Sequence, residues 1–131
     1  MGRKIGLEGG EVLRRLLADI RSEAEGEANL IGLADDCAAI AEHLLSSPPD
    51  DRLAASYPFL TMLSVLVGGW LLARQAAALE GYEGDPKFAA MKRAAARFYL
   101  DQIVPEAGGL AAAAMASAGI LYAIDEDAFA A

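Results

Sequence analysis

The sequence contains an uncharged stretch of 21 residues, from Leu53 to Ala73, and this stretch limits what the chain can fold into. A run of this length either spans a bilayer as one helix or forms the central helix of a soluble bundle. Ser56, Pro58 and Thr61 dilute its apolar character, and no cluster of lysine and arginine flanks either end to set an orientation. We therefore expect a fully buried core helix, the most buried helix of the fold.

Alanine dominates the rest of the chain and favours helix throughout. It occurs 29 times, whereas valine, isoleucine and threonine together number 12. Alanine is the best helix former because it loses no side-chain entropy in a helix. A second uncharged run, 107–124, is mostly alanine and glycine, which partition weakly into lipid. The composition therefore predicts an all-α fold without a membrane span.

The apolar periodicity predicts an up-and-down helical bundle of four to five helices over residues 11–119. The expected helices cover about 11–25, 27–46, 52–79 and 86–104, and 106–118 is either a kinked continuation or a fifth helix. Residues 1–10 carry four glycines, which should break any helix, so they form a leader or linker. Residues 120–131 form a tail with an acidic turn.

Prolines and one aspartate mark the expected helix ends. Asp85 and Pro86 are typical of an N-cap and a first helical residue, so the fourth helix should begin there. Pro58 should kink the third helix or mark its true start, because proline lacks the backbone donor and clashes with the preceding turn. Pro105 should interrupt the fourth helix. The large apolar residues of that helix lie roughly on one face: Phe88, Met91, Ala95, Phe98 and Ile103.

Two adjacent glycines, Gly68 and Gly69, lie in the middle of the third helix beside Trp70. A glycine inside a helix costs about 1 kcal/mol relative to alanine, so the pair needs a compensating contact. The usual compensation is the close approach of another helix, and the alternative is a ligand against exposed backbone. The indole N–H of Trp70 needs a partner if it is buried.

Charge and residue types exclude several classes of function. The net charge of −8 does not fit a nucleic-acid binder or an anionic lipid surface. The single cysteine, Cys37, excludes an internal disulfide and a cysteine-based zinc cluster, and one buried thiol fits a reducing cytoplasm. His43 lacks the Glu-x-x-His pairs of a ferritin-like metal site, and it lies too far around the helix from Cys37 to act with it. We expect no catalytic site and no metal site.

The fourth helix has a basic edge. Arg93 and Arg97 lie one turn apart and could hold a phosphate or a carboxylate. The alternative is ion pairing with the acidic first part of the chain, where residues 1–51 hold 11 acidic and 5 basic side chains. Charge runs of this kind are mostly solvated faces, so ion pairing is favoured.

Five segments of the chain carry a resemblance to a known family: 51–60, 67–74, 94–99, 104–107 and 123–129. Together they resemble the extra C-terminal domain of a bacterial branch of the acyl-CoA dehydrogenases, which includes methylmercaptopropionyl-CoA dehydrogenase-like enzymes. The resemblance covers about residues 3–129, and 3–10 resembles the join from the catalytic core. The Gly-Gly-Trp-Leu and Arg-Phe-Tyr segments at this separation are its most specific parts.

The resemblance implies a parent enzyme that dehydrogenates an acyl-CoA thioester with FAD as hydride acceptor. In that family the flavin, the thioester and the catalytic glutamate are held by upstream domains, so no catalytic, cofactor-binding or metal-binding residue is carried over to this chain, which should hold no cofactor. What is carried over is a set of positions for packing or for an interface: Gly68, Gly69, Trp70, Arg74, Arg97, Phe98 and Tyr99.

The sequence therefore predicts a non-catalytic accessory domain that packs on the dehydrogenase core, on another subunit or on itself as a homodimer. The apolar third helix is the expected contact strip. One alternative is that the domain contributes to acyl-CoA binding, with Arg93 and Arg97 near the CoA phosphates. Another is a stand-alone helical interaction module or a membrane-surface module, which the negative charge disfavours.

Overall fold

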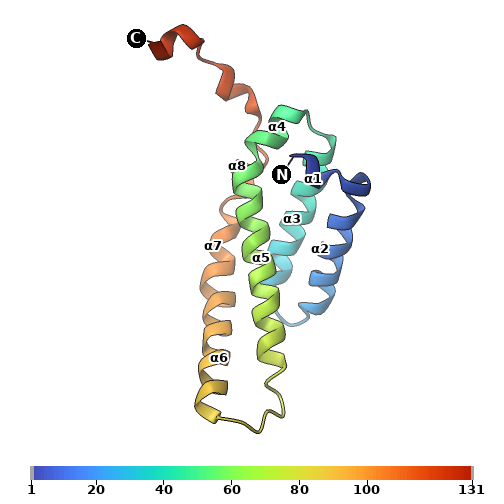
Figure 1. Cartoon of the computed structure of the whole chain (residues 1–131), viewed down its shortest axis with the longest axis vertical. Coiled ribbons are helices and arrows are strands. Elements are labelled where there is room, and N and C mark those ends of the chain that lie inside the picture. Colours follow the sequence, from blue (N-terminus) through green and yellow to red (C-terminus); the bar gives the residue numbers. More distant parts are fainter. Residues whose placement is uncertain (1, 131) are drawn as a thin grey trace.

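The computed structural model describes residues 2–130, and its architecture is all-α (Figure 1). The long elements are α2 (Glu11–Glu23), α3 (Ala28–Ser46), α5 (Ser56–Ala77) and one continuous segment made of α6 (Pro86–Phe98), the π-helical η2 (Tyr99–Ile103) and α7 (Val104–Gly108). The short ones are α1 (Gly2–Ile5), η1 (Leu7–Gly10), α4 (Pro49–Ala54), α8 (Ala111–Ala114), η3 (Ala118–Tyr122) and η4 (Glu126–Ala130). No strand is present between residues 2 and 130, and the predicted all-α bundle is confirmed.

The predicted helix starts at Pro58 and Asp85 are confirmed. Pro58 lies in the first turn of α5, where a missing N–H leaves no helical bond unmade, and the expected third helix is divided at Ala55 into α4 and α5. The Asp85 side chain accepts a hydrogen bond of 2.9 Å from the backbone N–H of Lys87 and so caps α6.

Pro105 does not end the fourth helix, because the π-helical segment before it accommodates the missing backbone N–H. The Val104 N–H bonds to the carbonyl of Tyr99, five residues back, instead of to Leu100. In this register the next donor, for the Leu100 carbonyl, would be the N–H that Pro105 lacks. The side-chain amide of Asn29 donates to the Leu100 carbonyl at 3.2 Å. The helix therefore continues to Gly108, and residues 111–114 form the separate short helix α8. The expected segment 106–118 is thus neither one continuation of the fourth helix nor one fifth helix.

The most buried helix is α3, so the prediction for the third helix is wrong. In α5, only 28% of the most apolar 18-residue window is buried. Both helices have several neighbours, but those of α5 leave one side of it uncovered, where Tyr57, Leu60 and Leu71 are exposed. The buried residues of α3 are Leu30, Leu33, Ala34, Cys37, Ile40, Ala41 and Leu44, and those of α5 are Pro58, Phe59, Met62, Leu66 and Gly69.

The two chain ends differ. Residues 2–10 form α1 and η1 instead of lacking helix as expected, and Ile5 is buried in the core. Gly9 and Gly10 take positive φ angles and form the bend between η1 and α2. The glycines therefore allow helical turns on either side of this bend. At the other end, the segment after Ala118 extends away from the bundle (Figure 1), and the Ala118 N–H donates to Asp51 Oδ1 at 2.7 Å.

The molecule has two unequal halves. In the bundle half, α2, α3, the first part of α5 and α7 share one hydrophobic core. Beyond the turn between α2 and α3, the end of α5 and α6 continue as a two-helix hairpin, residues 71–98 (Figure 1). The hairpin buries few large side chains, because α6 packs mainly on α5 alone.

Candidate interaction surface

Gly68 and Gly69 lie where α5 meets the α6–α7 segment. A Cβ atom on Gly68 would come within 2.6 Å of the Tyr99 hydroxyl. One on Gly69 would come within 2.8 Å of Leu30 Cδ1 and 3.1 Å of Val104 Cγ2. Both glycines therefore lie at close helix contacts, which offset their cost inside a helix.

Trp70 and Arg74 both contact Glu23 at the end of α2. The indole N–H of Trp70 donates to Glu23 Oε2 at 2.8 Å, and Arg74 Nε lies 3.5 Å from the same oxygen. The Arg74 guanidinium also lies 5.1 Å from the centre of the Trp70 ring, within the range of a cation–π contact. One carboxylate thus accepts from the partly buried Trp70 and joins α2 to α5.

Arg97 bridges two carboxylates on different elements. Its guanidinium binds Glu27 at the start of α3, at 3.0 and 2.9 Å, and Asp101, one turn further on. These hydrogen bonds, that to Glu27 first, raise the pKa of Arg97 above its usual value. The nearby Arg93 donates to the Leu79 carbonyl at 2.8 Å. The predicted ion pairing of the basic edge with the first part of the chain is therefore present at Arg97.

These side chains line a groove of about 530 Å³ between α5, α6 and the turn that joins α2 to α3. The groove contains Arg74, Arg93 and Arg97, but each of them already binds a carboxylate or a carbonyl. An anionic ligand would have to displace these internal partners, which costs the interactions that now satisfy them. These internal interactions connect the neighbouring helices, and the groove does not favour the binding of a phosphate.

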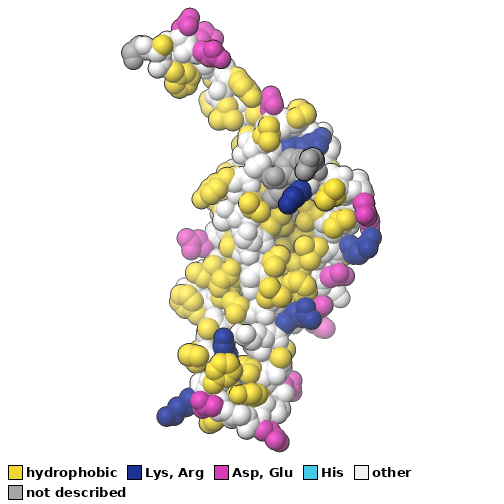
Figure 2. All heavy atoms as spheres, in the orientation of Figure 1, with side chains coloured by type: hydrophobic (Ala, Val, Ile, Leu, Met, Phe, Trp, Pro, Cys, Tyr) yellow, Lys and Arg dark blue, Asp and Glu magenta, His cyan; other side chains and the backbone are white. Residues whose placement is uncertain are grey.

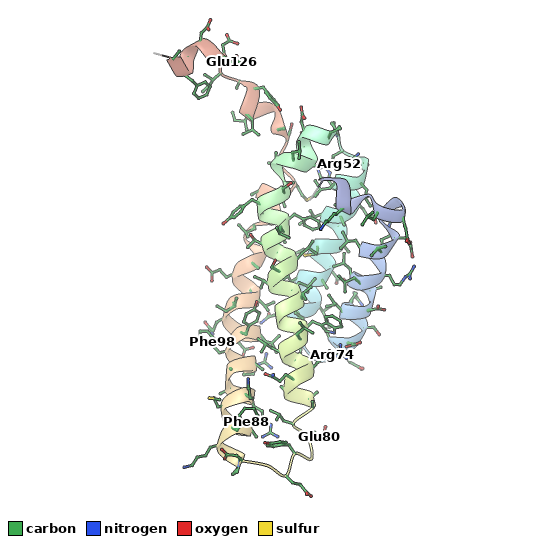
Figure 3. All side chains as sticks on the ribbon, viewed as in Figure 1. Arg52, Arg74, Glu80, Phe88, Phe98 and Glu126 are labelled. Atoms are coloured by element: carbon green, nitrogen blue, oxygen red, sulfur yellow. The ribbon has the colours of Figure 1, made fainter. Side chains whose placement is uncertain are left out.

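The last two predicted positions, Phe98 and Tyr99, point in different directions. The Tyr99 hydroxyl reaches α5, where it donates to the Val65 carbonyl at 3.4 Å, and partial burial raises the pKa of this phenol. Phe98 is 61% exposed and lies on the outer side of α6 (Figure 3). The structure thus places the predicted positions other than Phe98 at contacts that α5 and the α6–α7 segment make with each other and with α2 and α3.

A surface that we did not predict residue by residue runs along the outward side of α4 and α5. Figure 2 shows hydrophobic side chains gathered over this face. We call the exposed Leu53, Tyr57, Leu60 and Leu71 the outward strip. Together with Ser64 and Val67, the residues of the outward strip follow alternating spacings of four and three. This is a heptad pattern, and it can be recognised in the sequence. The sequence alone does not say which of the two apolar faces of this helix is covered.

The outward strip offers few free polar groups. The hydroxyl of Thr61 donates to the Tyr57 carbonyl at 3.0 Å, and that of Ser64 donates to the Leu60 carbonyl at 2.8 Å. Because these hydroxyls are satisfied inside their own helix, an apolar partner could cover them without leaving a donor unpaired. By length and hydropathy α5 is also able to cross a membrane, although core helices pass the same test.

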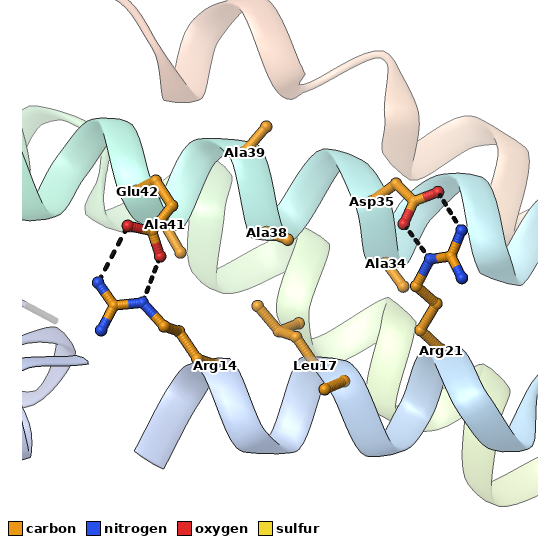
Figure 4. A pocket seen from close by; sticks show the side chains of 10 residues that line it. Arg14, Leu17, Arg21, Ala34, Asp35, Ala38, Ala39, Ala41 and Glu42 are labelled. Carbon is orange, nitrogen blue, oxygen red and sulfur yellow. Dashed lines mark hydrogen bonds and ion pairs between the residues drawn. The ribbon is translucent and has the colours of Figure 1, made fainter. Parts of the chain in front are cut away.

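A second groove lies between α2 and α3 (Figure 4). Its volume is about 380 Å³, and its floor consists of Leu17 and the small side chains of α3. Two ion pairs close its ends, Arg14 with Glu42 and Arg21 with Asp35. These two ion pairs connect the helices that form the walls. The groove lies between the ion pairs because the side chains of α3 there are small alanines.

Residues 2–130 contain neither a side-chain cluster placed to hold a metal ion nor a reactive thiol. Among residues 2–130 no group of three histidine, cysteine, aspartate or glutamate side chains is placed to hold a metal ion. Cys37 is buried in α3, and desolvation raises the pKa of its thiol to about 12. A thiol with this pKa is protonated at neutral pH and is a poor nucleophile.

These observations define an all-α domain with exposed apolar faces. A family model described as "Acetyl-CoA dehydrogenase C-terminal like" matches residues 14–125. The chain therefore belongs to this family of C-terminal domains of acyl-CoA dehydrogenase-like enzymes. A search of curated proteins found no match. A search of solved structures also found none.

Membership of this family implies an FAD-binding parent enzyme. The described residues do not fit a flavin dinucleotide, because the arginines of the α5–α6 groove are already bound to internal partners. The sequence also contains no glycine-rich loop between a strand and a helix to hold a pyrophosphate. We therefore derive no chemical step through a flavin in this chain.

Proposed function

We propose that this chain is a non-catalytic accessory domain of an FAD-dependent acyl-CoA dehydrogenase-like enzyme, and that the outward strip packs on the catalytic core domains. The observation that carries this proposal is the exposure of Leu53, Tyr57, Leu60 and Leu71 on a helix without a charge between residues 53 and 73. Large apolar surfaces of this kind are typical of contact sites. The family of the chain supports this choice of partner, because its description places such domains at the C-terminus of a dehydrogenase.

The strip has the properties that a stable intramolecular interface requires. Tyr57 is 78% exposed and supplies a large side chain with a polar tip, a residue type enriched at interfaces. The internally bonded hydroxyls of Thr61 and Ser64 allow the strip to lose water at little cost. The core surface opposite it is therefore apolar, with one acceptor or donor for the tyrosine hydroxyl. We also propose that the parent enzyme belongs to the methylmercaptopropionyl-CoA dehydrogenase-like branch, which the chain resembles, and that it is cytoplasmic.

Sedimentation velocity with the flavin-loaded core domains of the parent enzyme tests this function. The flavin absorbance should migrate with the added chain, and Leu60→Asp should abolish the comigration because it places a charge in the strip. Leu121→Asp is the matched control, since Leu121 is similarly exposed but lies in the C-terminal segment. If core and wild-type chain migrate separately at every ratio, the proposed function is wrong. Vesicle flotation in place of core binding would identify a lipid partner instead.

The alternative of acyl-CoA binding has a separate test. Because Arg93 and Arg97 already have internal partners, we expect no heat when acyl-CoA thioesters are titrated into the chain. Saturable binding that is lost in Arg97→Ala would overturn this expectation and place the CoA phosphates at the α5–α6 groove.

A further inference from the structure

Helix α6 buries its small residues and exposes its large ones. The residues that it buries are alanines, Ala89 and Ala96. Met91 and Phe98 are 59% and 61% exposed, and Phe88 is partly exposed beside Tyr82. An amphipathic helix in a complete fold normally has the opposite arrangement, with large apolar side chains inside.

The exposed residues form one continuous face. Phe88, Met91, Ala95 and Phe98 follow spacings of three, four and three, so they lie along one side of the helix. Phe98 lies on the side of the helix away from α5, whereas Phe88 lies beside Tyr82 of the turn that precedes α6 (Figure 3). We call these four residues the outer face of α6. It is separate from the outward strip, which belongs to α4 and α5.

On the edge of the outer face that carries Ala94, the charges change sign along the helix. Lys87 lies at one end and Asp101 at the other, each seven residues from Ala94. Asp101 shares Arg97 with Glu27, so that this cluster of two carboxylates and one guanidinium carries a net charge of −1. Along this edge the charge is positive at Lys87, absent at the small side chain of Ala94 and negative at Asp101.

From this pattern we propose that the outer face of α6 binds the same face of a second copy of the chain in antiparallel orientation. With a two-fold axis at Ala94, Lys87 of each copy lies opposite Asp101 of the other, and Met91 lies beside Phe98 of the other. Parallel pairing would instead set Lys87 against Lys87 and align the two helix dipoles. The contact involves one helix from each copy, so it is small and its dimer is concentration-dependent.

Light scattering on size-exclusion chromatography over a concentration series tests this inference. The mass of the wild-type chain should rise from 13.7 kDa toward twice that value. Phe98→Glu should raise the dimer dissociation constant by about 30-fold or more, because a central aromatic contact is replaced by a charge. Circular dichroism should be unchanged, since the side chain is exposed. A wild-type chain that stays at 13.7 kDa throughout, or a Phe98→Glu variant that dimerises as well as the wild type, would overturn the proposal.

Charge exchange tests the orientation. Lys87→Asp alone and Asp101→Lys alone should each weaken the homodimer, because like charges then face each other. A mixture of the two variants should form a heterodimer, since both contacts regain opposite charges in the antiparallel pair. Absence of the heterodimer from the mixture would contradict the antiparallel arrangement. Leu60→Asp should leave dimerisation intact, which separates a failure here from a failure of the proposed core contact.

Discussion

The bundle half and the hairpin half of this chain have similar helices but very different interiors. In the bundle half α3 has neighbours on several sides, and its Leu30, Ile40 and Leu44 are almost completely buried. In the hairpin half α6 rests mainly on α5, and alanines suffice for that contact. Large apolar residues in the hairpin are therefore not needed for the fold of the isolated chain. Their exposure indicates which surfaces are available to partners.

The largest expected difference between the halves comes from two phenylalanines. Phe59 is completely buried in the bundle core, so Phe59→Ala should lower the free energy of unfolding by about 3–5 kcal/mol. Phe98 is exposed on the hairpin, so Phe98→Ala should change the same quantity by no more than about 0.5 kcal/mol. Urea denaturation of dilute protein, followed by circular dichroism, measures both. Equal losses would mean that the two halves share one core.

Two glycines sharpen the contrast between a covered and an open helix face. Gly69→Ala should lower the free energy of unfolding by about 1 kcal/mol, because its methyl group meets Leu30 and Val104 and overpacking outweighs the gain in helix propensity. Gly32→Ala is the matched control in α3, where a Cβ meets nothing within 4 Å. It should raise stability by about 0.5–1 kcal/mol. A gain at both positions would show that α5 is not tightly packed at Gly69.

A smaller effect is expected at the π-helical segment that joins the halves. Asn29→Ala leaves the Leu100 carbonyl without its side-chain donor, and should lower the free energy of unfolding by about 1 kcal/mol. Ser46→Ala is the control, because its hydroxyl bonds only within its own helix and is exposed. If Asn29→Ala behaves like this control, water replaces the amide and the segment does not depend on Asn29.

The smallest effect concerns pH and the surface of the bundle half. Hydrogen bonding to Arg14 lowers the pKa of Glu42, so the ionised pair stabilises the fold above the ordinary glutamate pKa of about 4.3. This contribution is lost as the pH falls through the lowered pKa of the folded state. Arg14→Gln should therefore be less stable than wild type near pH 7, and the pH-dependent part of this difference should disappear in acid. Thermal denaturation at several pH values measures it, with Arg15→Gln as the control.

The sequence was sufficient for the helices and for most of their ends, because capping and proline rules act locally. Asp85 at the start of α6 and Pro58 in the first turn of α5 illustrate this. It was not sufficient for the outcome at Pro105, because the compensating donor, Asn29, lies 71 residues before Leu100, whose carbonyl it binds. Local rules also gave the wrong result for residues 2–10, where burial of Ile5 in the core accompanies the helical turns.

Part of the candidate interaction surface could also be predicted from the sequence. The glycine pair indicated a close helix contact, and the structure places Gly69 against Leu30 and Val104. The face of α6 that carries Met91 and Phe98 was visible as a stripe, but its direction depends on how many neighbours the helix has. That number is a property of the tertiary fold. The tertiary fold likewise leaves one side of α5 uncovered, so this helix is not fully buried as expected.

Hydrogen exchange of the chain at two concentrations tests the central claim most directly, namely that the hairpin half presents its large apolar residues to partners. In dilute protein, amides of residues 88–98 should exchange at least about 100-fold faster than those of residues 33–44, because local opening of α6 breaks few buried contacts. At high concentration the protection of 88–98 should rise in the wild type and not in Phe98→Glu. Slow exchange of both segments in dilute protein, with no effect of concentration, would contradict the account.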